Sequence, residues 1–443
     1  RSDFPAMRWT MDVAFRKRRA VGALVPLFFT VVTAPAASEE LSYTATTTLF
    51  TDLTHTERGS RSDTRLGAGA SGDIGANLLT GPHQLDALYG ASLESDRSTV
   101  ATGDRDNFSI RGSSRYNFYD PGSRFDFNAG HTIRSVRNET GFTLNESAYD
   151  TQNAVNAGAG VSFYPGELTT LRVGGQAAKT WAEDDLQDGE SSSVDANLMR
   201  QISERSTVSL TGRRAWEDEG DTDITIDSAS LGLDTRLENG SFSMTAGVSR
   251  AESDEVDNEA VIGSVSRQWQ TSLTSTRASY ERTQSSTLLD LALAPLPELG
   301  IEDEYSVRVQ GLTVNDTITL EHSTQRVCDL CTVNLIVRGS EEENVSTGDE
   351  TWEYLAGAGL GLAVTEDKTV DFDYRWQGDA LEERSSIDDQ RHSFIVTYRH
   401  QLTDLATWGA SFDTAFTRGE TDQERYQARL FFTLGWDGME RAW

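Results

Sequence analysis

Cysteine, proline, lysine and long apolar runs are all scarce in this chain of 443 residues. It contains 2 cysteines and 8 prolines, and its only lysines are Lys17, Lys179 and Lys368, so arginine supplies most of the positive charge. The mean hydropathy is −0.47, and after residue 32 no apolar run approaches the roughly 20 residues that a transmembrane helix needs. If this chain crosses a membrane, the sequence predicts that it does so with strands.

Negative charge dominates the chain. Asp and Glu number 70 against 39 Lys and Arg, which gives a formal net charge of −31 at pH 7. This balance argues against nucleic acid or an anionic membrane surface as a partner. Much of the acid falls in short runs, such as Glu183–Asp185 and Glu341–Glu343. These runs predict solvated loop tips or, as the alternative, sites where divalent cations bridge the protein to lipopolysaccharide.

A strict period of two runs through the last part of the chain, over residues 369–377, 407–416 and 426–436. Such alternation is the pattern of a β-strand with two different faces. One face carries apolar and aromatic side chains and the other carries charges, which suits a strand with lipid outside and water inside. In the first segment the two faces are Val370, Phe372, Tyr374 and Trp376 against Thr369, Asp371, Asp373, Arg375 and Gln377.

The start of the chain carries the features of an export signal. A basic run, Arg16–Arg19, is followed by the apolar run Ala20–Val32 and by small residues around Ala36. These are the three regions of a secretory signal peptide. We therefore expect residues 1–37 to be removed and residues 38–443 to form a single outer-membrane β-barrel domain.

Turn-forming residues recur about every 40 residues and divide the chain into hairpins. Nine tight turns with two flanking strands predict a transmembrane antiparallel up-and-down barrel of about 20 strands, within a range of 18 to 22. Tight turns alternate with longer, acidic segments, so we expect short periplasmic turns, longer outer loops and both termini in the periplasm. The predicted turns lie at residues 80–83, 120–123, 165–167, 203–205, 238–240, 268–270, 315–316, 366–368 and 403–404.

The same alternation predicts which side chains line the lumen. One interpretation is an arginine ladder that favours anionic solutes or acidic polymers. The other is a set of arginines paired with acids such as Asp126, Asp371, Asp373 and Asp413, which would stiffen the wall. The candidate lumen-lining residues are Arg111, Arg115, Arg134, Arg172, Arg213, Arg308, Arg375, Arg399 and Arg429.

Two connections have unusual composition. The apolar segment Thr287–Pro297 would be poorly solvated outside, and it could either narrow the mouth of a wide barrel or pack at the rim. Cys328 and Cys331 stand in a Cys-Asp-Leu-Cys sequence within the expected long connection from Ser323 to Glu350. No His follows Cys331 and no second Cys pair exists, which excludes c-type haem attachment and a structural zinc site. We expect a local disulfide, with a redox role as the alternative.

Catalytic patterns are absent. The sequence contains no Gly-x-Ser-x-Gly, no phosphate-binding glycine loop and no metal-ligand helix, so we expect no enzyme activity, no metal and no cofactor. The one adjacency that resembles the His and Ser of an outer-membrane phospholipase is His322-Ser323. A barrel enzyme acting at the rim is therefore kept as a minor alternative.

Two hairpins, Arg200–Leu210 and Tyr398–Leu405, share a basic residue, an apolar residue, a polar turn and a renewed strand. In this they resemble the outer-membrane barrels associated with PEP-CTERM and exopolysaccharide loci. The resemblance implies an outer-membrane component of polysaccharide production or export. Together with the arginine ladder, it predicts a barrel of a surface-polysaccharide system that passes polymer or anionic solutes. Its implied partners are outer-membrane lipid and lipopolysaccharide, the barrel-assembly machinery and periplasmic polysaccharide-export components. The alternative function is a closed structural or adhesive barrel that binds partners through acidic outer loops.

Overall fold

The computed structural model describes residues 39–98, 104–120, 122–137, 149–182, 188–219, 222–253, 257–286, 312–328, 330–381, 387–419 and 422–441. In these ranges the regular elements are 20 β-strands, which form one antiparallel sheet. No helix in the described ranges is long and apolar enough to cross a membrane. The expected signal peptide, residues 1–37, lies outside the described residues, and Ser38–Trp443 form one compact unit.

The strands follow one another around the sheet in chain order. Their bounds are β1 Glu39–Arg58, β2 Arg61–Thr80, β3 His83–Ser98, β4 Asp104–Tyr119, β5 Phe125–Arg137, β6 Tyr149–Gly166, β7 Thr169–Ala182, β8 Gly189–Gln201, β9 Ser206–Glu219, β10 Thr222–Leu237, β11 Gly240–Ser253, β12 Asp257–Gln270, β13 Thr274–Ser286, β14 Leu312–Thr324, β15 Cys331–Asn344, β16 Glu350–Thr365, β17 Lys368–Leu381, β18 Asp389–Thr403, β19 Ala406–Arg418 and β20 Gln423–Arg441.

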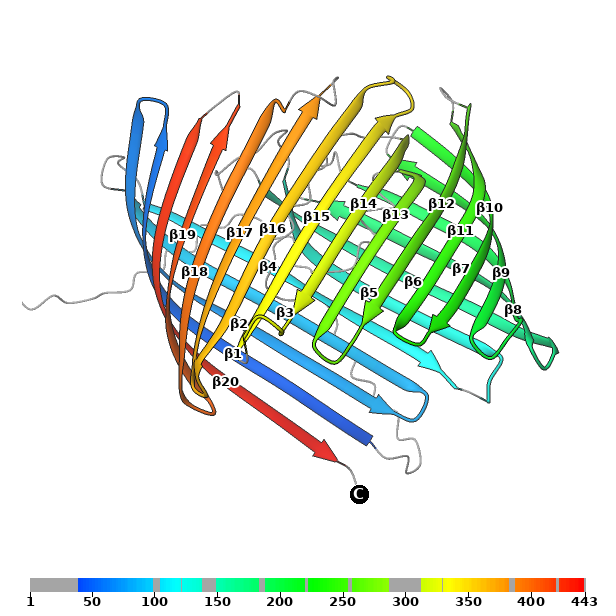
Figure 1. Cartoon of the computed structure of the whole chain (residues 1–443), viewed down its shortest axis with the longest axis horizontal. Helices are drawn as coiled ribbons and strands as arrows, with labels where there is room; N and C mark the ends of the chain where they lie inside the picture. Colours follow the sequence, from blue (N-terminus) through cyan, green and yellow to red (C-terminus); the bar gives the residue numbers. More distant parts are fainter. Residues whose placement is uncertain are drawn as a thin grey trace, which may run out of the picture. The chain divides into compact units, whose positions relative to one another are not determined.

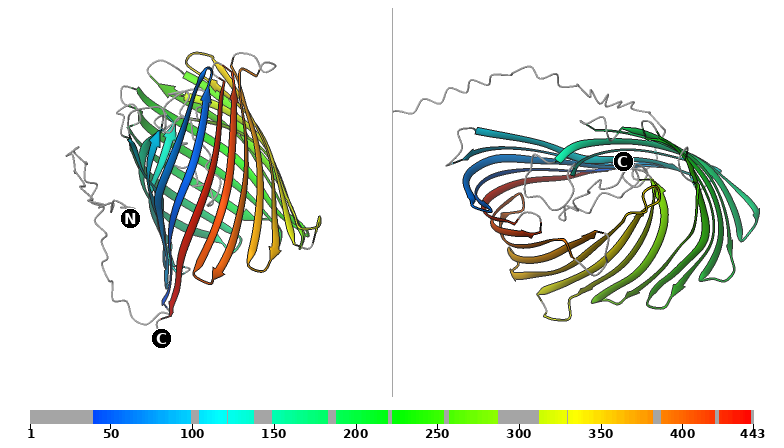
Figure 2. Two further views of the ribbon diagram at one scale, coloured as in Figure 1. Left: turned by 90° about the vertical axis from the view of Figure 1, so that its left-hand side faces the viewer. Right: turned by 90° about the horizontal axis from the view of Figure 1, so that it is seen from above.

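The first and last strands close the sheet into a barrel. β1 pairs with β20 along almost its whole length, from Glu40 opposite Arg441 to Arg58 opposite Gln423. Figure 1 shows the sheet of sequential neighbours, and Figure 2 shows the blue β1 beside the red β20. The predicted closed, antiparallel up-and-down barrel of 20 strands is therefore confirmed.

Seven of the nine tight turns lie where the sequence predicts them, and two predictions were wrong. Asn315 and Asp316 lie within β14, because Asp316 is held on the strand by Arg282 and Tyr280 of β13. The turn between β14 and β15 is instead residues 325–330, so β15 occupies much of the expected long connection 323–350. The turn predicted at residues 268–270 lies at 271–273, where Thr271 and Thr274 exchange hydrogen bonds. We call the end of the barrel that carries these nine turns the turn end.

The opposite end, called the loop end here, carries the other connections. They are less uniformly long than expected, because β1 and β2 are joined by Gly59 and Ser60 alone. Gly59 has a φ of +58°, which a two-residue hairpin turn requires and glycine adopts without strain. The longest connection, residues 287–311, includes the apolar segment 287–297 and lies outside the described residues. The first residue of β1, Glu39, and the last residue of β20, Arg441, both lie at the turn end.

The register defines two faces that can be followed around the whole barrel. Residues opposite each other in an antiparallel ladder share a face, and neighbours along a strand alternate. Leu430 of β20 lies opposite Thr51 of β1 and opposite Ala410 of β19. Following the ladders from Thr51 around the whole barrel assigns Ala410 to the same face as Leu430, so the assignment of faces is consistent. On one face, charged side chains meet across intervening strands: Arg172 of β7 contacts Asp126 of β5. Strands lie about 4.8 Å apart, so such contacts identify the concave, inner face.

The outer face carries an exposed apolar band. Its residues include Leu49, Leu66, Ile74 and Val261, whose exposed fractions are 57, 61, 68 and 68 %. Exposed aromatic side chains stand on this face toward both ends of the barrel. Toward the turn end they are Tyr43, Phe125, Trp269, Trp408 and Trp436; toward the loop end they are Phe108 and Trp216. An apolar band between two aromatic girdles is the surface of a transmembrane barrel.

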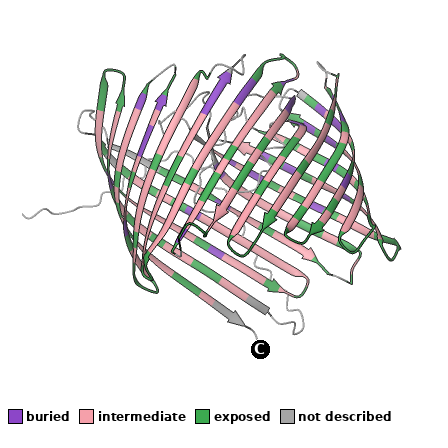
Figure 3. Cartoon of the chain, viewed as in Figure 1, coloured by how far each residue is buried: buried purple, intermediate pink, exposed green. Residues whose placement is uncertain are grey.

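Burial is unevenly distributed along the wall. In Figure 3 most of the buried positions gather toward the upper, loop ends of the strands, while exposed and intermediate positions alternate below. Several of the buried positions are polar and face inward, including Gln152, Thr180, Ser193 and Thr351. The buried apolar residues Ala215, Ile224, Ile226, Ala251 and Leu312 form a small cluster near the loop end, where most of the buried polar residues also lie.

Candidate functional site: the inner wall

Eight of the nine arginines predicted to line the lumen lie on inner-face positions of described strands, and Arg308 lies outside the described residues. Arg111 and Arg115 of β4 are exposed, whereas Arg134 of β5 is only 6 % exposed and donates to Gln152 at 3.1 Å. The remaining five are Arg172, Arg213, Arg375, Arg399 and Arg429, on β7, β9, β17, β18 and β20.

Arg172 forms the best-connected ion pair of the inner wall. Its Nη2 and Nε donate to the two oxygens of Asp126 at 2.6 and 3.1 Å, a two-pronged contact, and its Nη1 lies 3.4 Å from Asp195 Oδ2. The three residues come from β5, β7 and β8, so the cluster ties non-adjacent strands together. Bidentate guanidinium–carboxylate contacts are among the stronger and more directional ones in proteins.

A second cluster stands at the closure of the barrel. The guanidinium of Arg429 on β20 lies 4.3 Å from the ring centroid of Phe50 on β1 and 3.7 Å from Glu94 on β3. Beside it, the buried Asp52 accepts hydrogen bonds from Thr54 and from Gln427. The contact between Arg429 and Glu94 spans three strand spacings, so inner side chains converge here over the β1–β20 pairing that closes the sheet.

Charges of both signs share the adjoining wall. Arg399 of β18 pairs with Asp371 of β17, and Asp373 and Arg375 follow on the same face. Arg111 lies 4.0 Å from Asp73. In the β16–β17 turn, Asp367 accepts a hydrogen bond from the hydroxyl of Thr365, the last residue of β16, and this bond lowers the pKa of the Asp367 carboxyl group. The inner wall is thus a mixed-sign surface rather than a row of arginines without counter-charges.

Glycines let these long side chains lie flat against the wall. A Cβ atom added to Gly160 would stand 2.5 Å from Arg172 Nη2 and 2.7 Å from Asp126 Oδ2. Asp73 lies in the same way over Gly90, and the Phe50 ring lies over Gly69. Because glycine has no Cβ atom, the neighbouring side chain at each of these positions can lie along the strand surface instead of projecting toward the barrel axis. These side chains therefore extend less far into the lumen than their length alone implies.

Several inner-face charges are not among the residues that the sequence pattern singles out. Asp73, Glu94 and Asp195 form ion pairs with Arg111, Arg429 and Arg172, and Arg425 pairs with Asp413 at 3.5 Å. The alternation that identifies the arginines places these residues on the same face. What the sequence could not show is which of them meet, because each pairing depends on the register between different hairpins.

The structure separates the two members of the phospholipase-like pair. His322 faces outward, where its Nδ1 lies 2.8 Å from Thr276 Oγ1, whereas Ser323 faces inward on the same strand. They therefore form no catalytic dyad. Cys328 and Cys331 are joined by a disulfide, and the bridge lies at the turn end rather than in a long outer connection. No cluster of potential metal ligands occurs within the described ranges.

Comparison with known proteins adds little beyond the fold. No protein-family model and no curated protein matches the chain. Among solved structures, Pseudomonas aeruginosa OccK7 (OpdD) is 12 % identical, with 91 % of this chain and 100 % of that chain covered and a TM-score of 0.39. A mutant of the ferric enterobactin receptor PfeA from Pseudomonas aeruginosa is 14 % identical, with coverages of 90 and 82 % and a TM-score of 0.49. The FrpB iron transporter from Neisseria meningitidis is 9 % identical, with coverages of 88 and 82 % and a TM-score of 0.48.

Proposed function

We propose that this barrel lies in a Gram-negative outer membrane and provides a passage for a polymer of a surface-polysaccharide system or for anionic solutes. One observation carries the proposal: the outer face is an exposed apolar band, while the inner face is charged, with side chains such as Arg172 held flat over glycine. A barrel of 20 strands encloses more space than its wall side chains fill. Polar groups around such a space favour a water-filled passage.

The mixed sign of the wall favours the polymer over small anions. Arg172, Arg399 and Arg429 each have an acidic partner, which reduces the field available to attract a free anion. Paired guanidinium and carboxylate groups still offer alternating donors and acceptors, which suit a hydroxyl-rich chain sliding along the wall. The resemblance of the two hairpins to barrels of exopolysaccharide loci supports the same cargo. Periplasmic export components, lipopolysaccharide and the barrel-assembly machinery are the partners that this role implies.

Conductance of the purified full-length protein in a planar lipid bilayer tests the passage. We expect discrete current steps, and we expect a soluble oligosaccharide added to one side to block them transiently at concentrations where a small anion does not. Silence at all voltages would refute the passage. Steps that are blocked by small anions but not by oligosaccharide would retain the passage and replace the polymer by an anionic solute.

A closed structural or adhesive barrel is the second candidate, and a specific observation favours it. Inner-face polar residues near the loop end are almost completely buried, with exposed fractions of 1 % for Gln152, 2 % for Thr180 and 7 % for Thr351. In a wide, water-filled mouth these side chains would be exposed. Silence in the bilayer, together with binding of a partner to intact cells, would support this candidate.

A further inference from the structure

β12 and β13 are not paired along their full length. These two strands pair only from Gly263 opposite Arg282 to Gln270 opposite Ser275. Toward the loop end, residues 257–262 of β12 pair with β11 alone, and residues 283–286 of β13 pair with β14 alone. We call the gap between these two unpaired stretches the seam. Strand edges without a partner leave backbone donors and acceptors open to another molecule.

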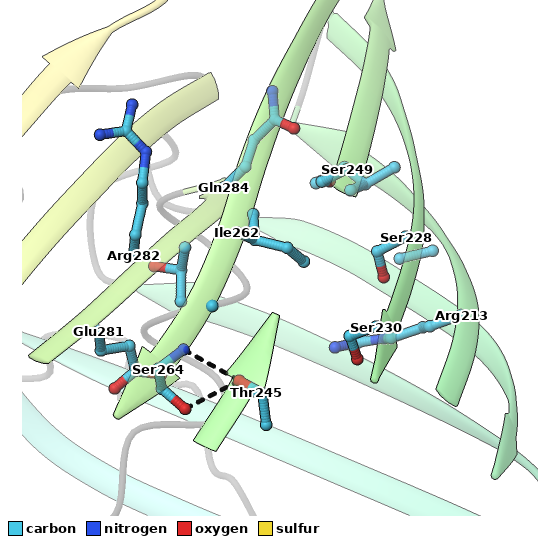
Figure 4. A pocket seen from close by; sticks show the side chains of 14 residues that line it. Arg213, Ser228, Ser230, Thr245, Ser249, Ile262, Ser264, Glu281, Arg282 and Gln284 are labelled. Carbon is cyan, nitrogen blue, oxygen red and sulfur yellow. Dashed lines mark hydrogen bonds between the residues drawn. The ribbon is translucent and has the colours of Figure 1, made fainter. Parts of the chain in front are cut away.

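A cavity of about 210 Å³ lies at the seam. Most of its lining is inner-face and comes from β9 to β13, but Gly263, Arg282 and Gln284 stand on outer-face positions. The cavity therefore reaches through the wall where the ladder stops. Figure 4 shows Arg213 and the serines of β10 and β11 on one side and Glu281, Arg282 and Gln284 on the other, with Ile262 between them.

The lining carries two buried polar side chains whose atoms lack partners. Gln284 is 8 % exposed, and neither its amide nitrogen nor its amide oxygen has a hydrogen-bond partner. Ser249 is 3 % exposed, and its hydroxyl is likewise unpartnered. Leaving buried polar atoms unpaired is costly, so their presence at one cavity indicates that a ligand supplies the missing hydrogen bonds.

Opposite charges stand at the two sides of the cavity. Among the described residues, the one hydrogen bond of Arg213 is donated by its Nη2 to the Ser193 hydroxyl at 3.5 Å, and Asp195, opposite it in the ladder, is engaged by Arg172. Across the cavity, Glu281 forms no ion pair within the described residues. Neutral hydroxyls such as those of Ser228 and Ser230 stand on the Arg213 side of the cavity (Figure 4). A guanidinium favours a phosphate and a carboxylate favours an ammonium group, so the lining complements a zwitterion.

The outer surface beside the seam indicates where such a ligand comes from. Val261, on the unpaired stretch of β12, is 68 % exposed, and Val248 and Ile318 are each 60 % exposed. Closer to the loop end, the ion pair Arg250–Asp257 takes the place of apolar side chains on this face, and Arg282 pairs with Asp316 beside the seam. The seam thus opens at the edge of the apolar band, at the level of lipid headgroups.

We propose that the seam between β12 and β13 is a lateral portal and that its cavity binds the zwitterionic headgroup of a phospholipid. The headgroup phosphate lies at Arg213, and its ammonium group lies at Glu281. Gln284 and Ser249 complete the hydrogen bonds of the headgroup, while the acyl chains remain outside against Val261 and its apolar neighbours. This inference goes beyond the proposed passage, and conductance does not test it.

Native mass spectrometry of the purified barrel, mixed with phosphatidylethanolamine or with phosphatidylglycerol, tests the site. We expect retained phosphatidylethanolamine to fall about tenfold or more in Arg213→Ser and in Glu281→Gln. The matched controls are Arg115→Ser and Glu321→Gln, which remove the same charges from inner-face positions outside the cavity. They should retain phosphatidylethanolamine as the unchanged protein does. Equal retention in all four variants, or equal loss of both lipids, would overturn the proposal.

Two further measurements test the site. The first distinguishes a binding role of Gln284 from a structural one, and the second distinguishes a lipid from a soluble compound as the source of the headgroup. Gln284→Leu should raise the urea midpoint of unfolding while lowering phosphatidylethanolamine retention, because it removes unpaired amide atoms and two ligand contacts. A lower midpoint would mean that Gln284 only supports the fold. If soluble glycerophosphoethanolamine competes with the lipid, the headgroup carries recognition as proposed. If the soluble compound binds and the lipid does not, the lateral route is overturned.

Discussion

Replacing Phe432 with arginine should prevent assembly of the barrel, whereas the same replacement at Phe431 should not. Phe432 stands on the outer face of β20, opposite Leu49 of β1 and Trp408 of β19. Phe431 stands on the inner face, opposite Phe50 and Gly409. The two positions are adjacent in the chain and belong to the same strand, so only the face differs.

The magnitude follows from the position of Phe432 in the apolar band. Tyr426 and Trp436 stand on the same face ten residues apart, and at about 3.3 Å per residue and a tilt near 40° they span roughly 25 Å along the barrel axis. That is the height of the apolar band in such barrels, and Phe432 lies near its middle. A charge there costs about 2–4 kcal/mol, a factor of about 30 to about 1000 in the folded population.

Heat-modifiability gels and urea titration in lipid vesicles measure the outcome. Phe432→Arg should show little folded band and be degraded in cells. Phe431→Arg loses the packing of the Phe431 ring over Gly409 but leaves its guanidinium in the lumen, so its folded band should remain. If Phe432→Arg assembled normally while Phe431→Arg failed, the two faces would be exchanged and the inner-wall assignment would be wrong.

Three other outcomes follow from the inner wall and the turn end. Gly160→Ala should lower the free energy of unfolding by about 1–3 kcal/mol by displacing Arg172, whereas Gly212→Ala, with nothing within 4 Å, should not; equal urea midpoints would contradict this. Arg172→Ser leaves Asp126 and Asp195 without their counter-charge, so the reversal potential in a salt gradient should shift toward cations, while the outward Arg214→Ser should not shift it. Cys328→Ser should cost about 2 kcal/mol in the chain-entropy account of a short disulfide loop, and a urea midpoint insensitive to reductant would refute that contribution.

Much of this fold can be predicted from local pattern alone. The alternation that separates Phe372 and Tyr374 from Asp371 and Asp373 depends only on the two-residue period of a strand, so it identifies both the strands and their faces. Turn-forming residues predicted most of the tight turns correctly, because Gly, Asn and Asp favour a turn through the backbone conformation of the four residues that form it. It failed at Asn315 and Asp316, where partners on β13 keep polar residues inside a strand.

Which side chains of the inner wall contact each other is decided by the tertiary structure. The sequence by itself determined that these are strands, that they are about twenty in number, and that charge and apolar surface take opposite faces, because each follows from neighbours a few residues apart. Only the tertiary structure decided that Arg429 meets Glu94, that Arg172 joins Asp126 to Asp195, and that β12 and β13 part above Gly263. The first depends on the closure of β20 onto β1, the second on the register among β5 to β8, and the third on how far the ladder between β12 and β13 extends, so none follows from the residues of one strand.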